Sequence, residues 1–97
     1  MRKILVTGGT VFASRYVAQY YVNKGDEVYV LNRNHHPQVE GVTLIEADRH
    51  DLQDVLKPYE FDIVLDVTAY TREDVVDLLK GLGTFRDYIM RSRISFT

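Results

Sequence analysis

"LVTGGTVFASRYVAQYYVNKG", residues 5–25, joins a strand, a glycine turn and a helix without a break. The apolar run from Lys3 to Thr7 predicts a strand that is covered on both faces. A helix is predicted from Thr10 to Lys24, and Gly25 just past it is typical of a helix end. Apolar residues at spacings of three and four predict one wide buried stripe on this helix: Phe12, Ala13, Tyr16, Val17, Tyr20 and Tyr21.

Strands alternate with helices along the rest of the chain. The further strands are predicted at 27–31, 42–46, 61–67 and from Tyr88 onward. Short apolar strands separated by helices favour a parallel sheet with right-handed crossovers. The predicted fold class is therefore α/β, a three-layer Rossmann-type parallel sheet with crossover helices. Its core is predicted to contain Ile4, Val6, Val28, Val30, Leu44, Val64 and Leu65.

Two more helices are predicted, and they differ in length. The short one, at 51–57, ends before Pro58 and is predicted to bury one apolar face: Leu52, Val55 and Leu56. The longer one, at 71–82, begins with a capping box in which Thr71 and Asp74 each bond to the other's backbone. Its buried stripe is predicted to comprise Val75, Leu78, Leu79 and Leu82.

The composition limits the function before any motif is considered. The 97 residues suit a single domain, 1–97, and the net charge of -2 argues against nucleic acid as a partner. The absence of cysteine excludes disulfides and thiolate metal sites. No apolar run approaches the length of a membrane span, so a cytoplasmic protein is expected. His35, His36 and His50 are interpreted as solvated side chains, and no metal is predicted.

The candidate site lies where the predicted strands end. In a parallel sheet of this kind, ligands bind at the carboxyl ends of the strands, near the point where the strand order reverses. Four short segments follow predicted strands and are therefore expected to form one site: 7–10, 32–33, 48–49 and 68–70.

These strand ends together resemble a known family. "KILVTGGTVFAS", "GDEVYVLNRN", "VTLIEADRHDLQDVL" and "FDIVLDVTAY" occur in the order and spacing of the N-terminal part of the NAD-dependent epimerase/dehydratase family, the extended short-chain dehydrogenase/reductase proteins. The resemblance extends from Lys3 to about Met90. It implies a Rossmann fold with a nucleotide-binding site for NAD(P), truncated after about five strands. A dinucleotide is thus the implied partner, and the substrate is not predicted.

The glycine turn carries the most direct implication. Gly8 and Gly9 match the family's opening T-G-x-x-G-x-x-G, and the resemblance places Thr10, Val11 and Phe12 beside them at the pyrophosphate. Val11 and the later Ser14 stand where the family has its second and third glycines. We expect a phosphate-binding turn weakened by the branched Val11 side chain. The alternatives are a plain strand–helix turn and a Thr10 side chain that only caps the helix.

The second strand end bears on the choice of cofactor. Proteins that prefer NAD carry an acid near this point, whereas this chain has Asn32 and Arg33. A guanidinium suits a 2′-phosphate, so Arg33 favours NADP over NAD. The alternative is a solvated surface arginine, with no cofactor bound.

The remaining two strand ends leave their roles open. Asp48 and Arg49 resemble the family's position that contacts adenine, or they supply charge at the start of the short helix. Thr68, Ala69 and Tyr70 resemble the strand end beside the nicotinamide, or they only lead into the next helix cap.

Catalysis in the family uses a Tyr-x-x-x-Lys pair. The chain has one such string, Tyr20 to Lys24, but it lies at the far end of the first helix and Tyr20 falls in the predicted buried stripe. We therefore predict no catalytic residue and a dinucleotide-binding portion that is not catalytically competent alone. The alternative is a vestigial Rossmann fold that acts as a nucleotide sensor or an interaction module. It would pair as a homodimer through its last strand, where Arg91 and Arg93 favour an exposed edge.

Overall fold

The computed structural model describes residues 1–8, 12–32, 40–67 and 71–90, with the backbone alone at 12–14 and 90. Seven elements follow one another along the chain. They are β1 (Lys3–Thr7), α1 (Phe12–Asn23), β2 (Glu27–Asn32), β3 (Val42–Glu46), β4 (Glu60–Asp66), α2 (Arg72–Gly81) and β5 (Thr84–Met90).

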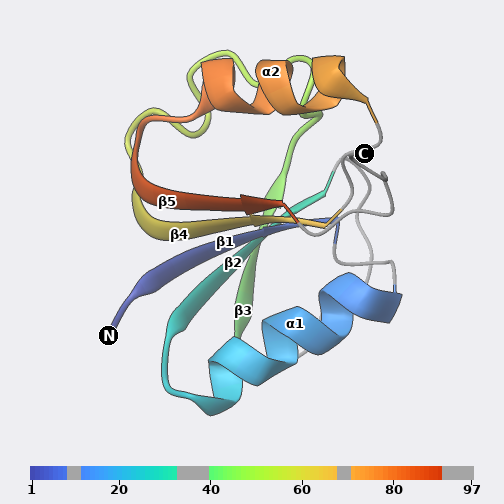
Figure 1. The fold of residues 1–97 in the computed structure, drawn as a ribbon. Coiled ribbons are helices and arrows are strands. Elements are labelled where there is room, and N and C mark those ends of the chain that lie inside the picture. The colour runs from blue at the N-terminus through green and yellow to red at the C-terminus, as the bar shows by residue number, and fades with distance from the viewer. Residues whose placement is uncertain (9–11, 33–39, 68–70, 91–97) are drawn as a thin grey trace.

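The five strands form one parallel sheet in the order β3-β2-β1-β4-β5. Helix α1 covers one face of the sheet and α2 covers the other (Figure 1). The chain steps from β1 to β2 in one direction and from β4 to β5 in the other, so the strand order reverses between β1 and β4. This arrangement confirms the predicted three-layer Rossmann-type sheet.

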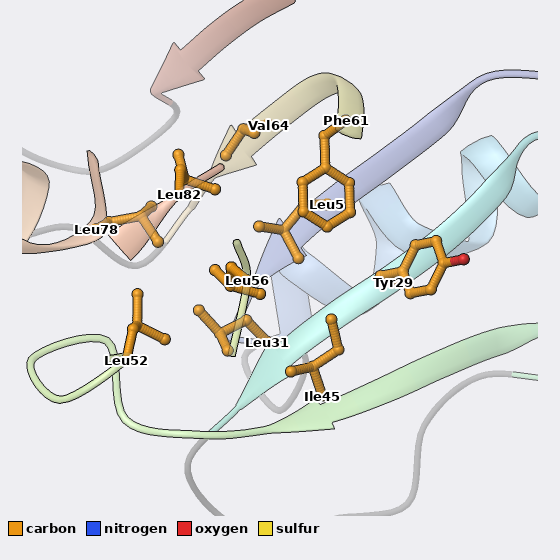
Figure 2. Close-up of a cluster of buried hydrophobic side chains, with 10 residues drawn as sticks. All are labelled: Leu5, Tyr29, Leu31, Ile45, Leu52, Leu56, Phe61, Val64, Leu78 and Leu82. Carbon is orange, nitrogen blue, oxygen red and sulfur yellow. The ribbon is translucent and has the colours of Figure 1, made fainter. Parts of the chain in front are cut away.

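The sheet separates two apolar cores. Because side chains alternate along a strand, Leu5 of β1 faces α2, whereas Ile4 and Val6 face α1. The core on the α2 face is shown in Figure 2 and contains Leu5, Tyr29, Leu31, Ile45, Leu52, Leu56, Phe61, Val64, Leu78 and Leu82. The core on the α1 face contains Ile4, Val6, Ala18, Val28, Val30 and Leu65. The predicted core is confirmed except at Leu44, which is only partly buried.

The predicted stripe of α1 is wrong at two tyrosines. Tyr16 is 71% exposed and Tyr20 is 52% exposed, whereas Ala18 is buried. The helix approaches the sheet through the small Ala18 side chain, which rotates the contact face toward Val22. A tyrosine at the margin of such a face keeps its hydroxyl in water at little cost.

The predicted helix at 51–57 is also wrong, because this segment forms successive turns. Its backbone bonds span three residues, as from Val55 N to the Leu52 carbonyl at 3.0 Å. Gln53 has a φ of 50°, a left-handed conformation that a helix does not contain. Leu52 and Leu56 are nevertheless buried, while Val55 is 43% exposed. Apolar spacing therefore identified two core residues without identifying the backbone between them.

Helix α2 begins as predicted. Thr71 Oγ1 accepts a bond from Asp74 N at 3.1 Å, and Asp74 Oδ2 accepts one from Thr71 N at 3.0 Å. Leu78 and Leu82 are buried, but the prediction for Leu79 is wrong, because it is 37% exposed. In the part of the chain that the structure describes, neither helix has the length and apolar character needed to cross a membrane.

Strand β5 starts at Thr84, four residues before the predicted start. The early start follows from Gly83, where a Cβ atom would crowd the carbonyl oxygens of Lys57 and Tyr59. The glycine lets the chain leave α2 and pair at once with β4, from Glu60 opposite Thr84 onward. Among the described strands, β5 and β3 form the two edges of the sheet.

Candidate functional site

The candidate site lies at the carboxyl edge of the sheet, where β1 is flanked by β2 and β4. Five predicted site residues have described side chains or backbone conformations there: Thr7, Gly8, Asn32, Asp48 and Arg49. The other predicted site residues lie outside the described residues, apart from the backbone of Phe12: Gly9, Thr10, Val11, Arg33, Thr68, Ala69 and Tyr70.

Gly8 turns the chain away from β1. Its φ of 95° lies in the left-handed region, which suits glycine because a Cβ atom would be strained there. Gly8 N donates to the Leu31 carbonyl at 2.8 Å, and the Gly8 carbonyl accepts a bond from Asn32 Nδ2. Asn32 is 8% exposed, so its side chain is directed at the turn rather than into solvent. The end of β2 thus fixes the geometry of the glycine turn.

Thr7 connects the same turn to β4. The last backbone pair between β1 and β4 is Val6 with Leu65. Beyond it, Thr7 Oγ1 donates to Asp66 Oδ1 at 2.9 Å and accepts a bond from Val67 N at 3.1 Å. The Thr7 hydroxyl therefore continues the contact between β1 and β4 as far as Thr7, the residue before Gly8.

Asp66 is the centre of a buried polar network. Its side chain is fully buried, and Arg49 donates from Nη2 to Oδ2 at 2.6 Å and from Nη1 to Oδ1 at 3.1 Å. The Tyr88 hydroxyl donates to Oδ2 at 2.5 Å. Burial, together with this bond to Asp66, raises the pKa of Tyr88, so the phenol keeps its proton. Each carboxylate oxygen thus receives two donors, which is how a buried charge is accommodated.

Arg49 is directed into the protein. Only 13% of its side chain is exposed, and its Nε donates to the Asp74 carbonyl in the first turn of α2 at 3.2 Å. The neighbouring Asp48 accepts a bond from His50 N at 2.9 Å, which forms a local turn. Because no helix follows, charge at the start of a short helix does not explain these residues. Contact of this pair with adenine stays a prediction.

His50 is paired, not simply solvated. Its Nδ1 lies 2.6 Å from Asp77 Oδ2 and its Nε2 lies 3.0 Å from Asp74 Oδ1, so the ring joins the loop after β3 to α2. The hydrogen bond with Asp77, more than the nearby negative charges, raises the pKa of His50. Within the described ranges, no group of three or more His, Asp or Glu side chains is arranged to hold a metal ion.

Tyr20 and Lys24 are near each other but do not form a catalytic arrangement. Lys24 Nζ lies 5.3 Å from the centre of the Tyr20 ring, over its face, which is a cation–π contact. The expectation that Tyr20 is buried was wrong. Tyr20 nevertheless lies far from the glycine turn, as predicted, because it is eight residues along α1 from Phe12, roughly 12 Å along the axis.

Sequence reasoning missed Asp66 and Tyr88. A usable signal existed for Asp66, because an aspartate inside the apolar run "IVLDV" must find a partner if the strand is buried. No local sequence pattern predicts that the partner is Arg49, because a full strand and a series of turns separate Arg49 from Asp66 in the chain.

The glycine turn, the reversal of strand order and the layered sheet define a Rossmann-type protein. A model of the NAD dependent epimerase/dehydratase family matches residues 4–90, so the chain belongs to that family. Over 56 residues, or 56% of the chain, it is 45% identical to the 2-alkyl-3-oxoalkanoate reductase of Stenotrophomonas maltophilia (strain K279a). The matched stretch covers 17% of that reductase.

Solved structures share the fold at low identity. A proposed epimerase from Bacteroides thetaiotaomicron superposes with a TM-score of 0.73 at 20% identity over 92% of this chain and 46% of its own. Vestitone reductase from alfalfa gives 0.74 at 15% identity over 93% of this chain and 36% of its own. The Bordetella bronchiseptica enzyme WbmH, in complex with NAD+, gives 0.64 at 15% identity over 84% and 34%. The chain spans less than half the length of each of these proteins.

Proposed function

We propose that residues 1–97 are the nicotinamide-dinucleotide-binding portion of an epimerase/dehydratase-type protein. The observation that carries the proposal is Gly8, which holds a left-handed φ of 95° at the end of a buried strand in a chain of this family. Such a turn lets a pyrophosphate approach the backbone and the positive end of the following helix, here α1. WbmH, which shares the fold, is described in complex with NAD+.

The proposed contacts follow the strand ends. Residues 8–12 hold the pyrophosphate, and the branched Val11 weakens that contact. Arg33 pairs with a 2′-phosphate, so NADP binds somewhat better than NAD. Asp48 faces the adenine and residues 68–70 lie beside the nicotinamide. Asn32 and Arg49 support this set from inside, through the bonds to the Gly8 carbonyl and to Asp66.

The chain alone is proposed to lack turnover. Solved proteins whose names describe different reactions, vestitone reductase and a UDP-N-acetylglucosamine 4-epimerase, share this part of the fold, which supports a common cofactor-binding role rather than a common substrate. The single Tyr-x-x-x-Lys string is placed far from Gly8 on α1. We therefore expect no conversion of sugar nucleotides by this chain.

A second candidate is a vestigial Rossmann fold that binds no nucleotide and acts through protein contacts. The observation in its favour is that β5 forms an edge of the sheet among the described strands. An edge strand offers unpaired backbone groups to a second strand, so this alternative predicts a homodimer through β5.

Calorimetric titration with NADP and with NAD separates the two candidates. The proposal expects weak binding to the wild type, tighter binding to Val11→Gly and no preference for NADP in Arg33→Ala. If neither the wild type nor Val11→Gly binds a dinucleotide, the binding proposal fails and the vestigial fold replaces it.

A further inference from the structure

We infer that Arg49 and Asp66 are positioning residues for the dinucleotide site, because their buried ion pair holds Thr7 and so sets the Gly8 turn. The inference rests on the proposed function only for its effect on affinity. Its effect on the turn itself can be observed without any ligand.

The first step is the route from Asp66 to Gly8. Thr7 is still paired with Leu31 of β2, but the backbone ladder between β1 and β4 ends at Val6, so beyond Val6 side chains join β1 to β4. Thr7 Oγ1 bonds to Asp66 at 2.9 Å and to Val67 N at 3.1 Å. Thr7 and Gly8 share one peptide unit, so a displacement of Thr7 also moves Gly8. That movement changes the hydrogen bond from Gly8 N to the Leu31 carbonyl.

The second step is the orientation of the Asp66 carboxylate, which is fixed by its hydrogen-bond donors. A carboxylate can rotate about its Cβ–Cγ bond, and although its two oxygens are equivalent, one of them points at Thr7 only when the carboxylate plane has the right orientation. The planar guanidinium of Arg49 donates to both oxygens, at 3.1 Å and 2.6 Å, which fixes that rotation. Tyr88 of β5 adds a donor to Oδ2 at 2.5 Å. Lysine has the same charge as arginine, but it lacks the fork that fixes the orientation.

The third step is the location of the pair. A buried ion pair is weak evidence for stability, because apolar residues of similar volume often serve as well. This pair lies at the carboxyl ends of β1 and β4, where the strand order reverses and the fold binds its ligands. It also joins β5 through Tyr88 and α2 through the Arg49 bond to the Asp74 carbonyl. Such support behind a binding surface keeps the contacting groups in place.

The experiment uses Arg49→Lys and Thr7→Val, with Thr7→Ser as the conservative rescue. The matched control is Arg2→Lys, since Arg2 also pairs with an aspartate, Asp26, at 3.2 Å but at the amino edge of the sheet. Hydrogen exchange of the Gly8 amide is measured by NMR without ligand. Gly25 and Gly41, which also have positive φ, serve as internal references.

We expect Gly8 to exchange about tenfold faster in Arg49→Lys and Thr7→Val, as for the loss of one hydrogen bond, with Gly25 and Gly41 unchanged. Thr7→Ser and Arg2→Lys should behave as the wild type. NADP affinity should also fall roughly tenfold in the first two variants, as expected when the net contribution of about one hydrogen bond is lost. If Arg49→Lys does not fold, Thr7→Val decides alone.

Two results would overturn the inference. One is a Gly8 exchange rate in Thr7→Val equal to that of Arg2→Lys. The other is an equal acceleration at Gly8, Gly25 and Gly41, which would assign the pair to global stability alone. If the wild type binds no NADP while Gly8 responds as expected, the proposed function fails and the positioning role stands.

Discussion

The sheet has two arginine–aspartate pairs, one at the amino ends of its strands (the amino edge) and one at their carboxyl ends (the carboxyl edge). The two pairs differ in how far they are buried. At the amino edge, Arg2 bonds to Asp26 at 3.2 Å, and 45% of the arginine side chain is exposed. At the carboxyl edge, Arg49 holds a fully buried Asp66 through two bonds. In the first pair the arginine is open to solvent although only 9% of the Asp26 side chain is exposed, whereas in the second pair both side chains are largely enclosed by protein. The carboxyl edge of the sheet thus contains a charge pair that is enclosed by protein, whereas the pair at the amino edge leaves its arginine half exposed.

The largest expected effect comes from breaking the buried pair. Asp66→Asn leaves the Arg49 guanidinium without its counter-charge and should lower the free energy of unfolding by about 3 kcal/mol. Urea denaturation measures the change. Asp26→Asn is the matched control at the amino edge and should shift the midpoint far less. Equal shifts in the two variants would mean that burial does not distinguish the pairs.

A second test compares two glycines that have nearly the same backbone conformation. Gly8 has a φ of 95° and Gly25 a φ of 90°, and a Cβ atom at Gly25 would meet nothing within 4 Å. Alanine at either position should cost about 1–2 kcal/mol of stability through backbone strain. Only Gly8→Ala should also abolish NADP binding, as judged by calorimetry. Retained binding in Gly8→Ala would show that the turn is structural only.

The dependence of stability on pH should reveal the His50 bridge beside the carboxyl edge. The native pKa of His50 is raised above its usual 6.5, chiefly by the hydrogen bond to Asp77. The bridge therefore contributes fully below about pH 6.5 and is lost as the pH rises through the native pKa. Thermal melts between pH 6 and 8 should show this loss in the wild type but not in His50→Gln. An NMR titration that places His50 at or below the ordinary value would contradict the prediction.

The smallest effect is expected from salt. The Arg2–Asp26 pair, in which 45% of the arginine side chain is exposed, should be screened at roughly 1 M salt, where the Debye length is about 3 Å. Arg2→Gln should therefore lower the melting temperature slightly at low salt and not at all at high salt. Arg49→Gln should lower the melting temperature at both ionic strengths, because water and ions do not reach the buried carboxylate of Asp66. A salt-dependent loss in Arg49→Gln would indicate that the pair is open to solvent.

Local patterns were enough to predict the sheet and which strand ends lie at one edge of it. Apolar runs and glycine positions predicted the strands, and the cap at Thr71 was predicted from Thr71 and Asp74 alone. These features depend on residues within one turn or one strand of each other. The parallel order then placed Thr7, Gly8 and Asn32 at one edge.

The features that the sequence did not predict depend on contacts between segments that are distant in the chain. The turns at 51–57 pack Leu52 against Gly81 of α2, where a Cβ atom on residue 81 would overlap the Leu52 side chain. The left-handed conformation of Gln53 is incompatible with a helix in this segment. The exposure of Tyr16 depends on how closely Ala18 approaches the sheet. The partner of Asp66 could not be inferred from spacing, because the fold brings Arg49 to it from another element.

The most direct test of the account follows amide chemical shifts while NADP is added to the wild type. We predict shifts at the carboxyl edge, at Gly8, Asn32 and Asp48, and none at the amino edge, at Arg2 and Asp26. The prediction is contradicted if NADP at saturating concentration moves no amide at the carboxyl edge, or if the shifts appear at Arg2 and Asp26 instead.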